Sequence, residues 1–165
     1  AVDTALAPEA ADPGRSAGTV AMLLVTYTGF ALLMMAGFVL AERAGHRITA
    51  RIGAVWGLAG FVAVHLAPAF GLPPELPGAA AAPLLARQIW WAACVAATAA
   101  GISALAFGRS LPLLAAGVVL IALPHLVGAP TAPYGGVVPP ELAAQFATRA
   151  LGAGAAGWLL LGTIA

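Results

Sequence analysis

GTVAMLLVTYTGFALLMMAGFVLA, residues 18–41, is a run of 24 residues without a charged side chain. The hydrocarbon core of a bilayer is about 30 Å thick, and a helix needs ~20 mostly apolar residues to cross it. Four more apolar stretches follow, at about 52–70, 80–108, 111–128 and 140–165. The alternating ten-residue pattern of a membrane β-barrel is not seen, so we predict an all-α membrane protein with about five transmembrane helices.

The overall composition is not that of a soluble globular domain. Of 165 residues, 62% are hydrophobic and 8% are charged, whereas soluble domains carry about 25% charged residues. The absence of lysine excludes a Walker A loop, and a net charge of +1 gives no basic surface for nucleic acid. The single cysteine, Cys94, excludes an intrachain disulfide and any site built on several cysteines. We therefore expect no enzyme and no catalytic cofactor.

The arginines predict an orientation. The loop after the first stretch holds Arg43, Arg47 and Arg51, and the loop after the third holds Arg109. Cytoplasmic loops carry an excess of arginine and lysine, so both loops are predicted to be cytoplasmic. The acidic tail, residues 1–17, then lies outside, and the C-terminus is cytoplasmic. We expect residues 18–165 to form a single transmembrane domain.

The chain contains an internal repeat. One copy reads HL (65–66), PPEL (73–76) and RQ (87–88), and the other reads HL (125–126), PPEL (139–142), Gln145 and Arg149. Pro-Pro occurs twice in the sequence, and Glu-Leu follows it both times. The spans from histidine to arginine are 22 and 24 residues. We interpret the two copies as diverged duplicates with insertions in their loops.

Each copy consists of an outward helix, an external loop and an inward helix. Both enter the membrane from the same side, and such parallel repeats are related by a pseudo-twofold axis along the membrane normal. His65 lies 14 residues after Arg51, and His125 lies 16 after Arg109. At 1.5 Å per residue these separations are about 21 and 24 Å. We expect both imidazoles in the outer part of the bilayer, facing a shared axis.

Polar side chains continue from the external loops into the apolar helices. Glu141, Gln145 and Arg149 are spaced by four residues, so they form one stripe on a helix. Arg87 and Gln88 lie inside the third apolar stretch. A charge at the centre of the bilayer costs at least ~2.5 kcal/mol on insertion scales, so each arginine needs a partner or a wet cavity.

These residues support two interpretations. In the first they are structural: the histidines bond neighbouring carbonyls, the glutamates begin helices, and the arginines pair with the glutamates to hold the external loops. In the second they line a metal or proton pathway. The candidate metal ligands are His65, His125, Glu75 and Glu141, and the supporting polar residues are Arg87, Gln88, Gln145 and Arg149. Two histidines on separate helices are also compatible with a b-type haem.

Several segments resemble one known family. They are VWGLAGF (55–61), GLPPELPG (71–78), RQIWW (87–91), PHLVGAP (124–130) and VPPELAAQFATRAL (138–151). In this order they are similar to the CbtA family of cobalt transporter subunits, and the resemblance begins at about Arg15. It implies cobalt uptake across the bacterial cytoplasmic membrane, in association with cobalamin synthesis. Members of that family look longer at the N-terminus, with a further hydrophobic helix. Their usual partner is CbtB, a short single-helix membrane protein that carries histidines.

The leading hypothesis is therefore a permease subunit for a divalent transition metal. Imidazole ligands suit cobalt, nickel and zinc, whereas a site of oxygen ligands alone favours magnesium or calcium. We expect cobalt or nickel as the transported ion, lipid as the surroundings and a small histidine-containing subunit as partner. The alternative is an accessory subunit of a larger membrane complex, with no transport role of its own.

Overall fold

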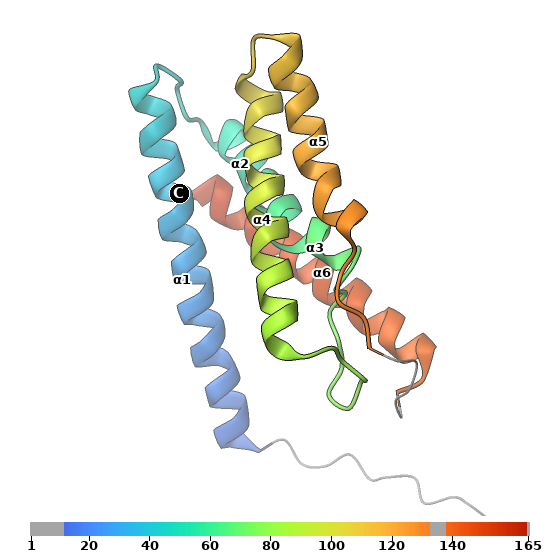
Figure 1. Cartoon of the computed structure of the whole chain (residues 1–165). Helices are drawn as coiled ribbons and strands as arrows, with labels where there is room; N and C mark the ends of the chain where they lie inside the picture. The colour runs from blue at the N-terminus through green and yellow to red at the C-terminus, as the bar shows by residue number, and fades with distance from the viewer. Residues whose placement is uncertain (1–11, 133–137, 165) are drawn as a thin grey trace, which may run out of the picture. The chain divides into compact units, whose positions relative to one another are not determined.

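The structure is a computed structural model and describes residues 12–132 and 138–164. Every regular element within these ranges is a helix, as the apolar stretches predict (Figure 1). The all-α membrane fold is thereby confirmed. The chain divides into two compact units, Ala1–His46 and Arg47–Ala165.

The first unit contains one long helix, α1 (Pro13–Arg43). It begins five residues before the predicted position, because Asp12 caps it and Pro13 occupies its first turn. The Asp12 carboxylate accepts a hydrogen bond of 2.9 Å from the Gly14 N–H. Its 31 residues span about 46 Å at 1.5 Å per residue, so α1 is longer than the ~30 Å hydrocarbon core.

The second unit begins with a continuous helical run that contains a π-helical turn. It consists of α2 (Ala50–Phe61), the π-helix η1 (Val62–Leu66) and the short α3 (Ala67–Ala69). The Ala67 N–H bonds to the carbonyl of Val62, five residues back. Pro68 follows directly, and its ring would clash with a carbonyl four residues back in a regular α-helix. The wider turn relieves that clash.

Three further helices complete the second unit. They are α4 (Leu84–Phe107), α5 (Leu111–Val127) and α6 (Pro140–Ile164). The start of α4 lies four residues after the predicted residue 80, because Pro83 is extended and disfavours the helical conformation for the residue before it. The helix α5 ends at Gly128, whose φ of 86° is accessible to glycine.

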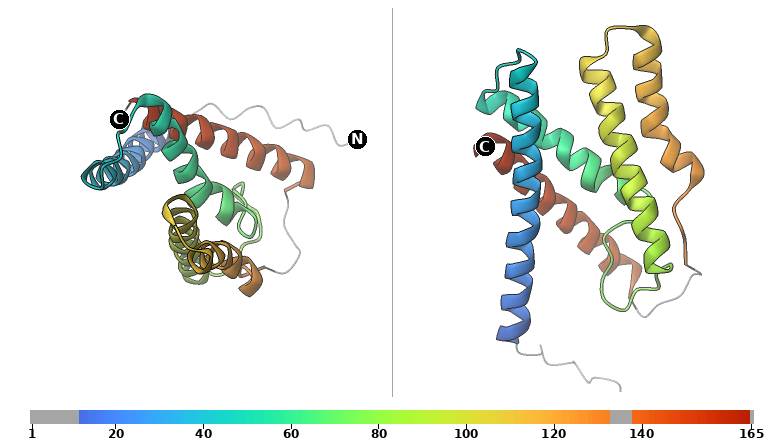
Figure 2. Two further views of the ribbon diagram at one scale, coloured as in Figure 1. Left: turned by 90° about the horizontal axis from the view of Figure 1, so that it is seen from above. Right: turned by 60° about the vertical axis from the view of Figure 1, so that its left-hand side comes forward.

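The helices of the second unit pack in two pairs. Helix α2 lies along α6, and α4 lies along α5 (Figure 2). Glycines allow both pairs to approach closely, since a Cβ at Gly57 would overlap the Trp158 carbonyl and one at Gly101 would overlap Gly117. The run η1–α3 packs against α4 and joins the pairs, with Ala67, Trp90 and Cys94 forming a buried cluster.

Three helical runs are long and apolar enough to cross a membrane: Pro13–Arg43, Ala50–Ala69 and Leu84–Phe107. Helix α5 is equally apolar but has 17 residues. Among the described helices α6 does not meet this criterion, because Glu141 and Arg149 lie in its first half. Membrane crossing by α5 and α6 stays a prediction.

Candidate functional site

An ion pair connects the loop after α3 to the first turn of α4. Arg87 Nη2 donates to Glu75 Oε2 at 2.8 Å, and the two side chains are 27% and 28% exposed. The Nε of Arg87 is buried and has no hydrogen-bond partner within the described ranges. The guanidinium is therefore held by one end only. This is one of the two arginine–glutamate pairs that the structural interpretation predicts.

His65 lies in the π-helical turn and is bonded to α6. Trp158 Nε1 donates to His65 Nδ1 at 3.1 Å, and the imidazole stacks on Phe61 with a centroid distance of 6.1 Å. Because Nδ1 accepts this bond, the neutral ring carries its proton on Nε2. The wide turn at Val62–Leu66 and the tryptophan of α6 together orient the imidazole.

One cavity brings together several of the predicted polar residues. Its volume is about 330 Å³, and its lining includes His65, Glu75, Arg87 and Gln88. These side chains come from the π-helical turn, the following loop and the first turns of α4. The cavity therefore offers an imidazole, a carboxylate, a guanidinium and an amide, all from the first copy of the repeat.

His125 lies in a different environment, next to Pro124 in α5. The rings of Phe70 and Trp90 approach it edge-on, with centroid distances of 6.2 and 6.1 Å. Trp90 Nε1 donates to the Pro124 carbonyl at 3.2 Å, which ties α4 to α5. His125 and Thr98 line a mostly apolar cavity of about 540 Å³. This cavity shares no lining residue with the one that His65 lines.

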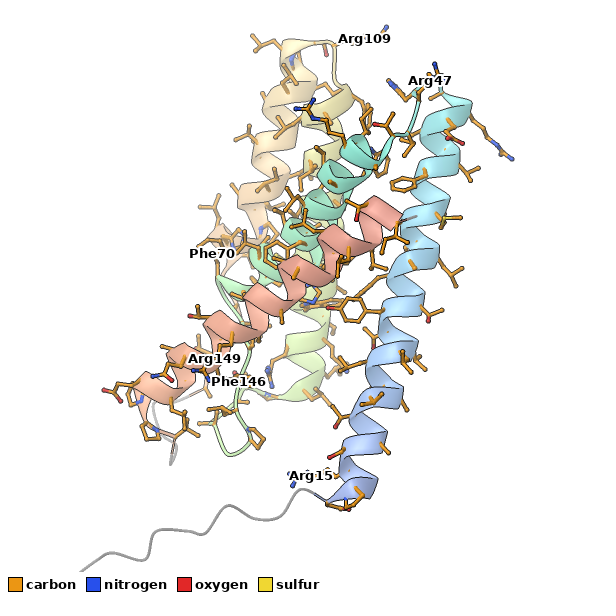
Figure 3. All side chains as sticks on the ribbon, turned by 180° about the vertical axis from the view of Figure 1, so that it is seen from behind. Arg15, Arg47, Phe70, Arg109, Phe146 and Arg149 are labelled. Carbon is orange, nitrogen blue, oxygen red and sulfur yellow. The ribbon has the colours of Figure 1, made fainter. Side chains whose placement is uncertain are left out.

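The remaining predicted residues lie on α6. Glu141 occupies its first turn, and Glu141, Gln145 and Arg149 are all exposed. Across the residues that the structure describes, Glu141 and Arg149 form no ion pair. Two helical turns separate them, about 12 Å along the axis. In Figure 3 Arg149 lies far from Arg47 and Arg109, which share one end of the second unit.

The structure thus brings His65 together with Glu75, Arg87 and Gln88, but not with His125 or the polar residues of α6. No three His, Cys, Asp or Glu side chains cluster as a metal site in residues 12–132 and 138–164. Sequence reasoning missed Trp158 as the partner of His65. A tryptophan amid the small residues of α6 was the available signal, since close packing places such a ring against the neighbouring helix.

Comparisons with known proteins give one match. No curated protein and no solved structure matches the chain. A family model described as "Probable cobalt transporter subunit (CbtA)" matches residues 3–165, which is nearly the whole chain. The match agrees with the apolar helices and with the order of the Pro-Pro-Glu-Leu and histidine segments. The chain belongs to the CbtA family of cobalt transporter subunits.

Proposed function

We propose that this chain is the membrane permease subunit of an uptake system for a divalent transition metal, with cobalt as the transported ion. One observation carries the proposal: Glu75 and His65 line the same cavity of about 330 Å³. A carboxylate and an imidazole together suit cobalt or nickel better than magnesium, which prefers oxygen ligands alone. Family membership supports a role in transport.

Glu75 is the first ligand in this proposal. It lies in the loop between α3 and α4, and about a quarter of its side chain is exposed. A hydrated cation can therefore reach the carboxylate without entering the helical region. The amide of Gln88, which lines the same cavity, offers a carbonyl oxygen to the ion or to its water. Water and a partner subunit complete the coordination shell, because these two side chains supply only part of it.

His65 acts at the second stage. In the structure its Nδ1 accepts from Trp158, so the neutral ring has its proton on Nε2 and no lone pair left for a metal. The ring becomes a ligand through Nε2 only when the Trp158 bond opens and the proton moves to Nδ1. Metal binding at His65 is thereby coupled to the attachment of α6.

The second copy of the repeat supplies Glu141 and His125 as the equivalent residues in this proposal. The helix pairs support the repeat, because a twofold that exchanges α2 with α5 and α4 with α6 converts one pair into the other. The shared end of Arg47 and Arg109 supports the orientation, since both loops then face the cytoplasm (Figure 3). The loop with Glu75 faces outward, and the N-terminus is outside.

Radioactive cobalt uptake by cells that depend on this system tests the proposal. Glu75→Gln removes the charge and keeps the size, so we expect uptake at low cobalt to fall by about tenfold or more, as when ligands of metal sites are changed. Glu42→Gln, at the end of α1, is the matched control and leaves uptake unchanged. Normal uptake by Glu75→Gln at the same amount of protein in the membrane would contradict the proposal.

One observation favours the alternative of an accessory subunit. The described residues bring no three metal-binding side chains together, and a structural subunit of a larger assembly needs no such cluster. Purification in mild detergent distinguishes the two. A stable stoichiometric complex, whose cobalt uptake is the same with wild-type chain, Glu75→Gln and His65→Gln, identifies the accessory role.

A further inference from the structure

We propose that Arg87 is a tethered competitor of the metal: its guanidinium occupies the cation position on Glu75, and the incoming ion must displace it. The inference rests on the proposed function and adds a determinant of affinity to the same site. Arginine and metal then exchange at one carboxylate, and the departing metal is replaced by an internal cation.

The geometry of the pair is that of an exchangeable contact. Arginine and carboxylate form their strongest pair through two parallel N–H···O bonds. Here a single bond of 2.8 Å joins Arg87 Nη2 to Glu75 Oε2. Arg87 Nε is buried and unpartnered within the described part of the chain. The contact therefore lacks the second bond that would fix the guanidinium in place.

The ion pair stands between two cavities. The cavity of about 330 Å³ contains His65 and Gln88. A second cavity of about 270 Å³ is formed by the loop after α3 and the segment around Pro130. Leu72, Glu75 and Arg87 line both cavities. Glu75 is accordingly accessible from two sides, and a displaced guanidinium has space on either side of its present position.

A site for the displaced guanidinium lies on the same helix. Trp91 follows Arg87 by one helical turn and lines the cavity with His65. The face of a tryptophan ring attracts a guanidinium, so the arginine can leave Glu75 without becoming an isolated charge in an apolar region. Both members of the pair are more than a quarter exposed, and water also lowers the cost of separating them.

Cobalt uptake and cobalt binding to purified protein in detergent test the inference. Arg87→Gln removes the competitor, and we expect the half-saturating cobalt concentration to fall about fivefold, which corresponds to ~1 kcal/mol. Arg87→Lys keeps a cation and stays near wild type. Arg109→Gln makes the same charge change in the loop between α4 and α5 and has no effect.

A double substitution assigns the effect to the pair. In a Glu75→Gln background, Arg87→Gln should give no further gain in affinity, because the shared carboxylate charge is gone. Unchanged or weakened cobalt binding by folded Arg87→Gln protein would overturn the inference, and it would leave the transport function standing if wild-type uptake is normal. If no variant transports cobalt but Arg87→Gln binds it more tightly than wild type, the competition holds and the proposed function fails.

Discussion

The hydrogen bond between Trp158 and His65 makes the sharpest prediction about stability. Trp158→Phe removes the indole N–H and keeps an aromatic ring, so the Nδ1 of His65 loses its donor. The bond connects α6 to the π-helical turn, and its N···N distance of 3.1 Å lies within the range of a real hydrogen bond. Its loss should weaken the α2–α6 pair.

The expected energy follows from measurements on membrane helices. Side-chain hydrogen bonds between such helices contribute about 0.6 kcal/mol on average and up to ~1.7 kcal/mol. Trp158→Phe alone costs more, because the smaller ring also loses contacts with Gly60. A double-mutant cycle with His65→Phe cancels that packing loss. We expect a coupling energy of ~0.6–1.7 kcal/mol between the two positions.

Reversible unfolding in mixed micelles measures the four free energies of the cycle. Trp91→Phe is the matched control, because Trp91 is 42% exposed and should lose little on substitution. A coupling energy below ~0.3 kcal/mol would refute the assignment of the bond, since additivity within that limit is expected of independent sites. It would also remove the reason for calling the Nε2–H tautomer of His65 dominant.

Two other predictions concern packing in the second unit. Gly162→Ala should destabilise the fold by ~1–3 kcal/mol in the same unfolding assay, because the added Cβ would overlap the Gly53 carbonyl. Gly152→Ala, with no atom within 4 Å of the new Cβ, should be neutral or stabilising by up to ~1 kcal/mol, and equal effects of the two substitutions would contradict the packing of α2 on α6. Cys94 is fully buried, so a water-soluble maleimide should label it only after denaturation; rapid labelling of folded protein, followed by mass spectrometry, would show that the α3–α4 contact opens.

Helix positions followed from the sequence because lipid allows few alternatives. Apolar runs of adequate length must be helical in a bilayer, and α5 (Leu111–Val127) therefore lies within one residue of its predicted bounds. The errors are at helix starts, where local groups decide. Asp12 and Pro13 extend α1 toward the N-terminus, and Pro83 delays α4. These effects come from caps and proline geometry, not from hydrophobicity.

The candidate site was only partly accessible to sequence reasoning. The pairing of Glu75 with Arg87 was one of the two predicted interpretations, and their separation of 12 residues across a Pro-rich loop is compatible with it. Trp158 and His65 are 93 residues apart, and no local pattern connects them. The π-helical turn was also unforeseen, because its i+5 bonding depends on how Pro68 is accommodated in the folded helix.

The pairing of α2 with α6 and of α4 with α5 has a consequence for synthesis of the chain. Helix α2 ends at Phe61, whereas α6 begins at Pro140, so α2 leaves the ribosome long before its partner exists. The hairpin of α4 and α5 can form at once, because a three-residue connection joins them. Until α6 is inserted, the glycine face of α2 is open to lipid or to an insertion chaperone. The last helix of the chain therefore completes the assembly of the first helix of the second unit.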